Sequence, residues 1–322
     1  MATIEQLKAL VRTHFEADEE KFKSIALQIA AHEARAGHIV SAREIRDIVQ
    51  SPKNNIKKKK FELLNKNDIL DLSSSDVQMK DLILSESLNV KINRILTEYK
   101  NRDLLGKNGL KNRSKILITG EPGTGKTMTA AVLANELGLD LFVIQIDKLI
   151  TKYMGETSIK MRQVFEQIED YPSVYLFDEF DAIGSDRTLD NDVGEMRRIL
   201  NSFLQFLENA NSYSIIIAAT NSPNILDKAL FRRFDDVLKY EIPDINQIEM
   251  ILLNKLKDIS PQSIFNINIY KKIVELYLSH ADIIRACNEA IKLFIIDRQA
   301  ITEEILISFL KDRVNLFNKK EA

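Results

Sequence analysis

The chain has 322 residues, of which 45% are hydrophobic and 29% charged, and its 45 basic and 47 acidic residues give a net charge of −2. This balance provides no global positive field, so we expect neither nucleic acid nor a membrane as a partner. The single cysteine, Cys287, excludes a disulfide framework and favours a reducing, cytoplasmic location. The longest apolar runs, 130–134 and 215–219, are far shorter than the ~20 residues of a membrane span, and we expect no secretory signal.

The first 55 residues show apolar side chains at helical spacing and no strand pattern. They predict one helix within 4–15 and a second around 22–30. Gly37 is placed to end the second helix, and Ser41 with Glu44 forms a capping box for a third. We therefore expect a helical region over 1–55 that recognises a substrate or partner.

Residues 56–88 are polar and are expected to be a linker. They include the lysine run 57–60, which fits a solvated connector. The alternative is a patch for nucleic acid or an acidic partner.

From 89 to 243 short apolar segments alternate with helical stretches. The expected strands are Lys115–Thr119, Leu141–Ile146, Val174–Phe177, Ser214–Ala219 and Asp236–Tyr240, and the expected helices include 127–137, 158–169 and 195–208. Continuously apolar, β-branched strands separated by helices predict an α/β fold with a five-stranded parallel sheet covered on both faces. From 244 to 322 the apolar residues recur at helical spacing alone, which predicts a smaller helical domain.

A glycine-rich loop follows the first of these strands. Residues 120–127 read Gly-Glu-Pro-Gly-Thr-Gly-Lys-Thr and match the phosphate-loop pattern between a strand and a helix. Glycine permits a tight turn whose N–H groups point at phosphates, while Lys126 is expected to reach the β- and γ-phosphates and Thr127 to bind Mg²⁺. The residues expected to hold ATP are Gly120, Glu121, Pro122, Gly123, Thr124, Gly125, Lys126, Thr127 and Met128.

Two carboxylates, Asp178 and Glu179, directly follow the apolar segment 174–177. Carboxylates at the end of a buried strand are costly unless a cation or a reaction uses them. We expect Asp178 to complete the Mg²⁺ site and Glu179 to polarise the attacking water.

Further polar groups follow later strands. Asn221 follows Thr220 at the end of the strand that begins at Ser214, and it is placed to reach the γ-phosphate or the water. Arg232 and Arg233 suit charge stabilisation in phosphoryl transfer, although an arginine pair is also common as surface charge.

In this order the motifs resemble the AAA family of ATPases, within the AAA+ superfamily, over about residues 80–315. The resemblance implies an α/β ATPase domain of the P-loop NTPase type over 89–243, a helical lid over 244–322, and hydrolysis of ATP with Mg²⁺. It places Asn221 at the sensor-1 position. It makes Arg232 and Arg233 arginine fingers that enter a neighbouring subunit's site, which implies a homo-oligomeric ring, usually a hexamer.

Residues 152–155 resemble the first pore loop of substrate-threading AAA proteins. An exposed aromatic beside a flexible Met and a Gly can grip an extended polypeptide, and the residues are Lys152, Tyr153, Met154 and Gly155. The alternative is a tyrosine packed on the sheet edge. The leading hypothesis is an ATP-dependent protein remodeller or unfoldase, and the second is an ATP-gated assembly switch, such as a DNA-associated loader or a defence-system regulator.

Some positions depart from the family pattern. Glu121 replaces a proline, the arginine region is shortened, and Ser279–Ile283 stands where lids carry Gly-Ala-Asp/Glu, leaving Arg285 as a sensor-2 candidate. These variants resemble a bacterial single-ring group related to sporulation protein K-type ATPases. The sequence has no H-E-x-x-H or G-x-S-x-G motif and its dispersed histidines make no zinc site. If proteolysis follows, we expect a separately encoded, subtilisin-like protease to perform it.

Overall fold

The computed structural model describes residues 4–15, 19–35, 37–38, 41–43, 45–46, 69–73, 76–150, 156–184, 192–222, 228–259 and 266–318. They belong to two compact units, Met1–Asn67 and Asp68–Ala322, which are taken separately. Within the described residues, no helix has the length and apolar content required to cross a membrane.

The first unit contains two helices that contact each other, α1 (Ile4–Phe15) and α2 (Glu19–Arg35). Both helices were predicted, and α2 buries an apolar stripe that includes Ala26, Ile29 and Ala30. Gly37 follows α2 with a φ of 90°, a left-handed conformation that suits a helix end. Glu44 of the predicted capping box lies outside the described residues.

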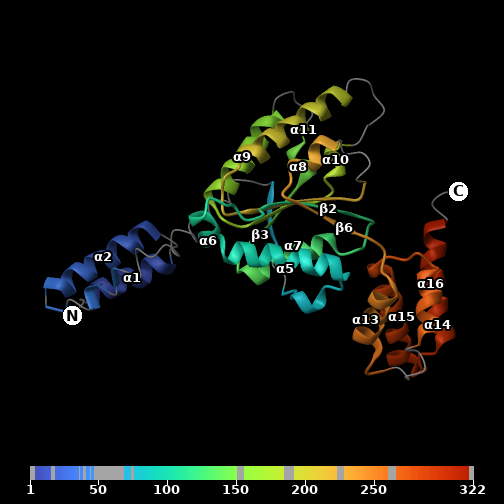
Figure 1. Cartoon of the computed structure of the whole chain (residues 1–322). Helices are drawn as coiled ribbons and strands as arrows, with labels where there is room; N and C mark the ends of the chain where they lie inside the picture. The colour runs from blue at the N-terminus through green and yellow to red at the C-terminus, as the bar shows by residue number, and fades with distance from the viewer. Residues whose placement is uncertain are drawn as a thin grey trace. The chain divides into compact units, whose positions relative to one another are not determined.

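The second unit is built on a six-stranded sheet of order β1-β3-β4-β5-β2-β6 (Figure 1). The five predicted strands are confirmed within two residues at each end and pair in parallel. They are β2 (Lys115–Gly120), β3 (Leu141–Ile144), β4 (Val174–Phe177), β5 (Ile215–Thr220) and β6 (Asp236–Tyr240). The carboxyl ends of β2, β4 and β5 therefore lie side by side, which brings the loops that follow them together.

The sixth strand, β1 (Leu70–Ser73), was not predicted. It pairs antiparallel with β3 at one edge of the sheet and lies within the segment expected to be a linker. Only Leu70 of its side chains is buried. Leu70 and Leu72 do alternate with polar residues, but a strand of four residues is too short for this alternation to stand out from the polar segment around it.

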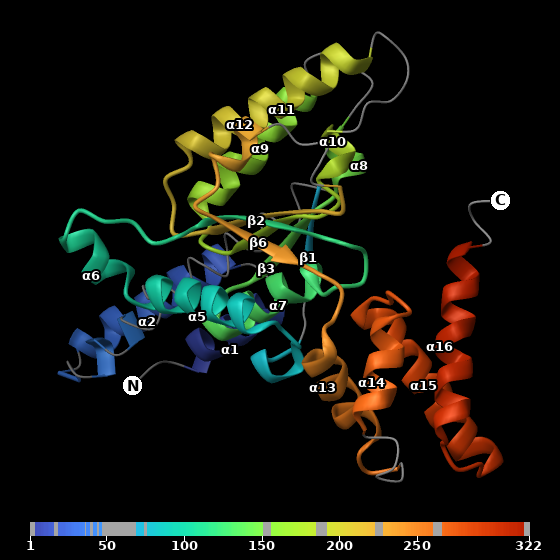
Figure 2. The same cartoon turned by 45° about the vertical axis from the view of Figure 1, so that its right-hand side comes forward.

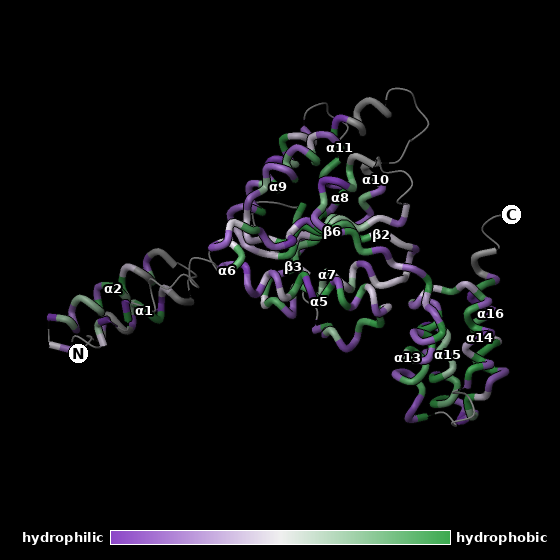
Figure 3. The backbone as a smooth tube through the Cα atoms, viewed as in Figure 1, coloured by the Kyte–Doolittle hydropathy of each residue, from purple (hydrophilic) through white to green (hydrophobic). Residues whose placement is uncertain are grey.

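Helices cover both faces of the sheet. In Figures 1 and 2, α5 (Glu86–Lys100) and α7 (Lys126–Leu137) lie below it, and α9 (Glu156–Asp170) and α11 (Asp192–Asn209) lie above it. Colours for hydrophobic and hydrophilic residues alternate along these helices in Figure 3, as expected for helices with one buried face. The shorter helical elements are η1 (Met79–Asp81), α6 (Arg102–Lys107), α8 (Ile146–Leu149), α10 (Asp181–Gly184) and α12 (Lys228–Phe231).

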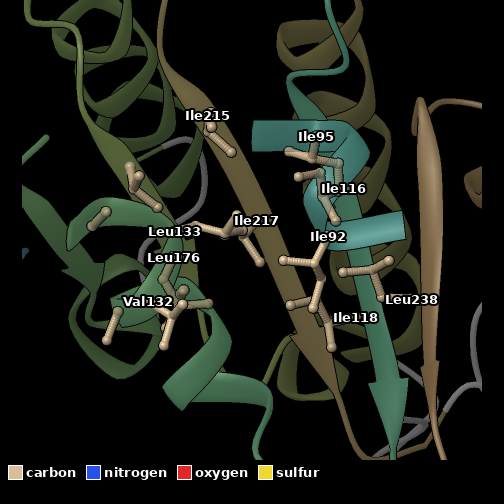
Figure 4. Packing of buried hydrophobic residues seen from close by; sticks show 14 of the residues in the cluster. Ile92, Ile95, Ile116, Ile118, Val132, Leu133, Leu176, Ile215, Ile217 and Leu238 are labelled. Carbon is tan, nitrogen blue, oxygen red and sulfur yellow. The ribbon is translucent and has the colours of Figure 1, made fainter. Parts of the chain in front are cut away.

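The two faces of the sheet are packed differently. On the α5 and α7 side the core is aliphatic, and Figure 4 shows Ile92 and Ile95 of α5 beside Ile116 and Ile118 of β2. On the other side aromatic rings dominate: the rings of Phe177 and Phe203 meet edge to face with centroids 5.1 Å apart. Strands buried on both faces hold the phosphate loop and the acidic strand end on a rigid base.

The described residues after 244 are mainly helical, as their apolar spacing predicted, and this helical region is called the lid below. Its helices are α13 (Ile245–Leu256), α14 (Ile267–Val274), α15 (His280–Asp297) and α16 (Glu303–Asn318). Asp244 caps α13, because its carboxylate accepts a hydrogen bond from the backbone N–H of Gln247 at 2.8 Å. The lid has its own hydrophobic core, in which Cys287 is fully buried and burial raises the pKa of its thiol to about 12.

Candidate active site

The phosphate loop runs from the end of β2 to the start of α7 with its backbone tightly enclosed. Gly120 has a φ of 149°, and a Cβ there would lie 2.4 Å from the carbonyl oxygen of Tyr240 on β6. Gly123 has a φ of 77°, and a Cβ there would lie 2.6 Å from the Oγ of Ser279 in the lid. Neither position has room for a side chain. The sheet therefore fixes the backbone of the loop at Gly120, and the lid fixes it at Gly123.

Lys126 lies at the first position of α7, with only 7% of the residue exposed. Its Nζ donates hydrogen bonds to the carbonyl oxygens of Gly120 and Glu121, both at 2.8 Å. Burial lowers the pKa of this ammonium group, and the nearby Asp178 carboxylate acts in the opposite direction. Since an ammonium group has three donors, one N–H remains for a ligand beyond these two carbonyls.

Thr127 and Asp178, predicted from two separate motifs, are in direct contact. The Thr127 hydroxyl donates to Asp178 Oδ2 at 2.7 Å across 51 residues of sequence, and Asp178 Oδ1 accepts the backbone N–H of Glu179 at 2.9 Å. Mg²⁺ prefers hard oxygen ligands and is usually held by one or two protein groups together with substrate phosphates. The described residues contain no cluster of three or more His, Cys, Asp or Glu side chains that could hold a metal alone. Thr127 and Asp178 therefore fit a phosphate-bound Mg²⁺.

Glu179 adopts a left-handed backbone conformation with a φ of 51°. This conformation costs a non-glycine residue about 1–3 kcal/mol and is maintained only where neighbouring contacts impose it. Here the next residue, Phe180, donates its N–H to the carbonyl oxygen of Ala219 on β5 at 2.8 Å. The strained turn places Glu179 on the wall of the cavity described below, next to Asp178.

Asp181 connects the acidic turn to the end of β5, a role that the sequence analysis missed. Its Oδ1 accepts the Thr220 hydroxyl at 3.1 Å and the backbone N–H of Asn221 at 3.2 Å. Asn221 also lines the cavity, so Asp181 fixes the backbone that carries it. The sequence shows the carboxylate of Asp181 three residues after Asp178, but it does not reveal the hydrogen bond to Asn221, which lies 40 residues further along the chain.

These groups surround one cavity of about 440 Å³. Its predicted wall consists of 122–128, Asp178, Glu179 and Asn221; the remaining lining residues are Asp81, Leu82, Ile83, His280, Ala281 and Ile284. The cavity thus combines the backbone of the glycine-rich loop and charged groups with apolar side chains from the segment before α5 and from the lid. That combination fits a nucleotide, whose triphosphate is charged and whose base is flat and largely apolar.

His280 is buried in the lid wall of this cavity and is held in one tautomer. Gln247 Oε1 accepts the backbone N–H of Asp244 at 3.1 Å, so Gln247 Nε2 is the donor that faces His280 Nε2 at 3.2 Å. The proton of the neutral imidazole must then be on Nδ1, which is buried and has no hydrogen-bond partner among the described residues. Burial lowers the pKa of His280 to about 4, so the ring is neutral at physiological pH.

The three arginines singled out from the sequence are not among the residues that line the cavity. Arg233 forms an ion pair with Glu208 of α11, whereas Arg232 is exposed without an ion pair in the described part of the chain. Arg285 is exposed on α15 and is not among the residues that line the cavity. The proposed pore loop, 152–155, lies outside the described residues.

Comparison with known proteins places these features in one family. Residues 116–242 match the ATPase family associated with various cellular activities, AAA. An uncharacterized AAA family ATPase, y4kL of Sinorhizobium fredii, is 34% identical over 94% of this chain and 93% of its own. A putative 26S proteasome regulatory subunit homolog of Methanothermobacter thermautotrophicus is 33% identical over 55% of this chain, which spans about half (48%) of that relative. The structure of the FIGL-1 AAA domain shares the fold, with a TM-score of 0.59 and 23% identity over 85% of this chain and 97% of that domain.

Proposed function

Because the chain belongs to the AAA family of ATPases, we propose that it couples ATP hydrolysis in this cavity to the remodelling of a protein substrate. The observation that carries the proposal is the contact between Thr127 and Asp178 at 2.7 Å, with Glu179 adjacent. This contact joins the start of α7 to the two carboxylates after β4, which supports a site for phosphates and a cation.

Each side chain has a chemical task in this proposal. The loop N–H groups and Lys126 bind the β- and γ-phosphates and offset the negative charge that develops in the transition state. Glu179 orients a water molecule and receives its proton as the water oxygen bonds to the γ-phosphorus and the bond to the β–γ bridging oxygen breaks. A Mg²⁺ ion held by Thr127 and Asp178 would supply further charge neutralisation at the phosphate oxygens. Asn221, fixed by Asp181, would orient the water or the γ-phosphate.

Two variants test this assignment. We expect Lys126→Ala to lose nucleotide binding. We expect Glu179→Gln to bind ATP normally while its turnover number falls at least 100-fold, since general-base groups contribute roughly 10²–10⁴-fold. Equilibrium binding and steady-state phosphate release measure the two effects. Hydrolysis by Glu179→Gln at the parent rate would contradict the role of that carboxylate.

The arginines act between subunits in this proposal. Arg233 is engaged by Glu208 of its own chain, so Arg232 is the better candidate for the finger that reaches a neighbour's γ-phosphate in a ring, such as a hexamer. Arg232→Ala and Lys126→Ala proteins should each be inactive alone. Mixed together they should regain activity, because some interfaces combine an intact Lys126 with an intact Arg232 from the adjacent subunit. No recovery in mixed assemblies, verified by size, would argue against a trans finger.

The protein substrate is engaged by Tyr153 in this proposal, and a separately encoded protease, such as a subtilisin-like one, could receive it. Tyr153→Ala should keep basal ATPase activity and lose remodelling. Stimulation of the ATPase by an unfolded model protein is expected. Stimulation by DNA instead, with a steep dependence on salt, would favour the loader alternative.

A further inference from the structure

The lid touches the backbone of the phosphate loop at Gly123. The N–H of Ala281, in the first turn of α15, donates to the carbonyl oxygen of Gly123 at 3.0 Å. Ser279, the N-cap of α15, lies against the same glycine, because a Cβ on Gly123 would meet its Oγ at 2.6 Å. The start of α15 is therefore in contact with the bend of the loop that would hold the phosphates.

Asp282 holds this helix start together. The Ser279 hydroxyl donates to Asp282 Oδ2 at 2.6 Å, and the Asp282 N–H returns a hydrogen bond to Ser279 Oγ at 3.3 Å. Only 7% of Asp282 is exposed. A carboxylate buried to this extent requires a counter-charge, since an unpaired buried charge is strongly destabilising.

Arg313 on α16 supplies that counter-charge. Its Nη2 donates to Asp282 Oδ1 at 3.0 Å and its Nε lies 3.4 Å from the same oxygen. The two residues are 31 apart in sequence, and their pair joins the last described helix to the start of α15. The contacts form a continuous series from Arg313 through Asp282 and the α15 start to Gly123.

We propose that Arg313 is a positioning residue for nucleotide binding, because it fixes the α15 start on the phosphate loop through Asp282. Without Arg313 the buried carboxylate would turn toward water, Ser279 would lose its partner, and the hydrogen bond from Ala281 to Gly123 would loosen. The direction of the loop N–H groups depends on the path of the backbone at Gly123. The nucleotide site would then bind more weakly although no residue that contacts the nucleotide has changed.

The chain contains a second, more exposed ion pair on α16 that serves as a control. Lys272 of α14 and Glu303 of α16 are joined at 2.5 Å, so this pair also fixes α16 within the lid. Neither residue belongs to the cavity or to the contacts at Gly123. Arg313→Gln and Lys272→Gln thus each remove one lid ion pair, and only the first is connected to the loop.

The test uses the full chain and a fluorescent ATP analogue. We expect Arg313→Gln to weaken binding about 10-fold with a turnover number within about 2-fold of the parent, and Lys272→Gln to leave both unchanged. Hydrogen exchange should quicken at the amides of Ala281 and Asp282 in Arg313→Gln only. In an Asp282→Asn background, Arg313→Gln should add little, since coupled residues are not additive. Arg313→Lys keeps the positive charge and should lose less affinity for the ATP analogue than Arg313→Gln. If Arg313→Gln unfolds the lid, the test is made with Arg313→Lys instead.

The inference rests on the proposed nucleotide site, and the outcomes separate the two. If Lys126→Ala abolishes binding while Arg313→Gln binds like Lys272→Gln, the positioning role of Arg313 is wrong and the site is sound. If Lys126→Ala also binds ATP normally, the site assignment itself is wrong. Equal loss of affinity in Arg313→Gln and Lys272→Gln would mean a general effect of lid stability, which also overturns the proposal.

Discussion

The protonation of His280 should make the folded protein less stable in mild acid. In an unfolded chain this imidazole has the ordinary pKa of 6.5, whereas burial lowers its pKa to about 4 in the fold, with Asp244 acting weakly in the opposite direction. Below pH 6.5 the unfolded chain therefore binds a proton that the folded chain does not take up until about pH 4. Stability is lost as the pH falls through this window. The loss from this one group is roughly 3 kcal/mol in full and about 2 kcal/mol at pH 5.

The comparison with His280→Gln isolates this contribution. A glutamine at this position retains an oxygen that can accept the hydrogen bond from Gln247 Nε2 but does not titrate. Urea unfolding followed by circular dichroism at pH 7.5 and pH 5 should show the parent losing about 2 kcal/mol more than the variant. The other three histidines are common to both proteins, so their effects cancel. An equal loss in the two proteins would refute the neutral, buried state of His280.

Three further predictions, each comparing two variants, test contacts in this part of the molecule. Gly120→Ala should lower the free energy of unfolding by at least about 2 kcal/mol, because its Cβ would lie 2.4 Å from a backbone oxygen. Gly109→Ala has nothing within 4 Å of its Cβ and should lose only the free energy needed to hold alanine at a left-handed φ. Thermal unfolding of the two variants measures this difference. Thr129→Val should destabilise the fold more than Tyr240→Phe, because the Thr129 hydroxyl forms hydrogen bonds with both the Tyr240 hydroxyl and the carbonyl oxygen of Gly125. Equal urea midpoints of unfolding for the two variants would contradict this. Asp181→Ala should reduce the ATPase turnover number and leave the affinity for ATP unchanged. Asp181→Asn should retain part of the turnover, because its side-chain oxygen can still accept the Asn221 N–H. Equilibrium binding measures the affinity, and phosphate release measures the turnover.

The sequence predicted the elements of this fold well where burial imposed a pattern. The five parallel strands are apolar because helices cover both sides, and the glycines at 120, 123 and 125 have the left-handed φ values that the loop pattern implies. β1 escaped detection because an edge strand of this length is held by backbone hydrogen bonds, which any sequence can make.

The site could be predicted only in part. Lys126, Thr127, Asp178 and Glu179 could be singled out because ATP chemistry requires fixed residue types at fixed spacing along a short stretch, and the structure brings all four to one cavity. Asp181 and His280 were not, because their partners come from other segments and only the fold brings them together. The sequence alone also treated Arg232 and Arg233 alike, and their difference depends on Glu208 of α11.

The buried Cys287 provides a way to measure the local unfolding of the lid. It is the one cysteine of the chain, it lies in the core shared by the lid helices, and its raised pKa keeps it in the unreactive thiol form. A thiol reagent can therefore modify the native protein only when the core of the lid unfolds locally, so the labelling rate measures the free energy of that local unfolding. No cysteine has to be introduced or removed for this purpose. Slower labelling in the presence of ATP would report directly how strongly the nucleotide stabilises the folded lid.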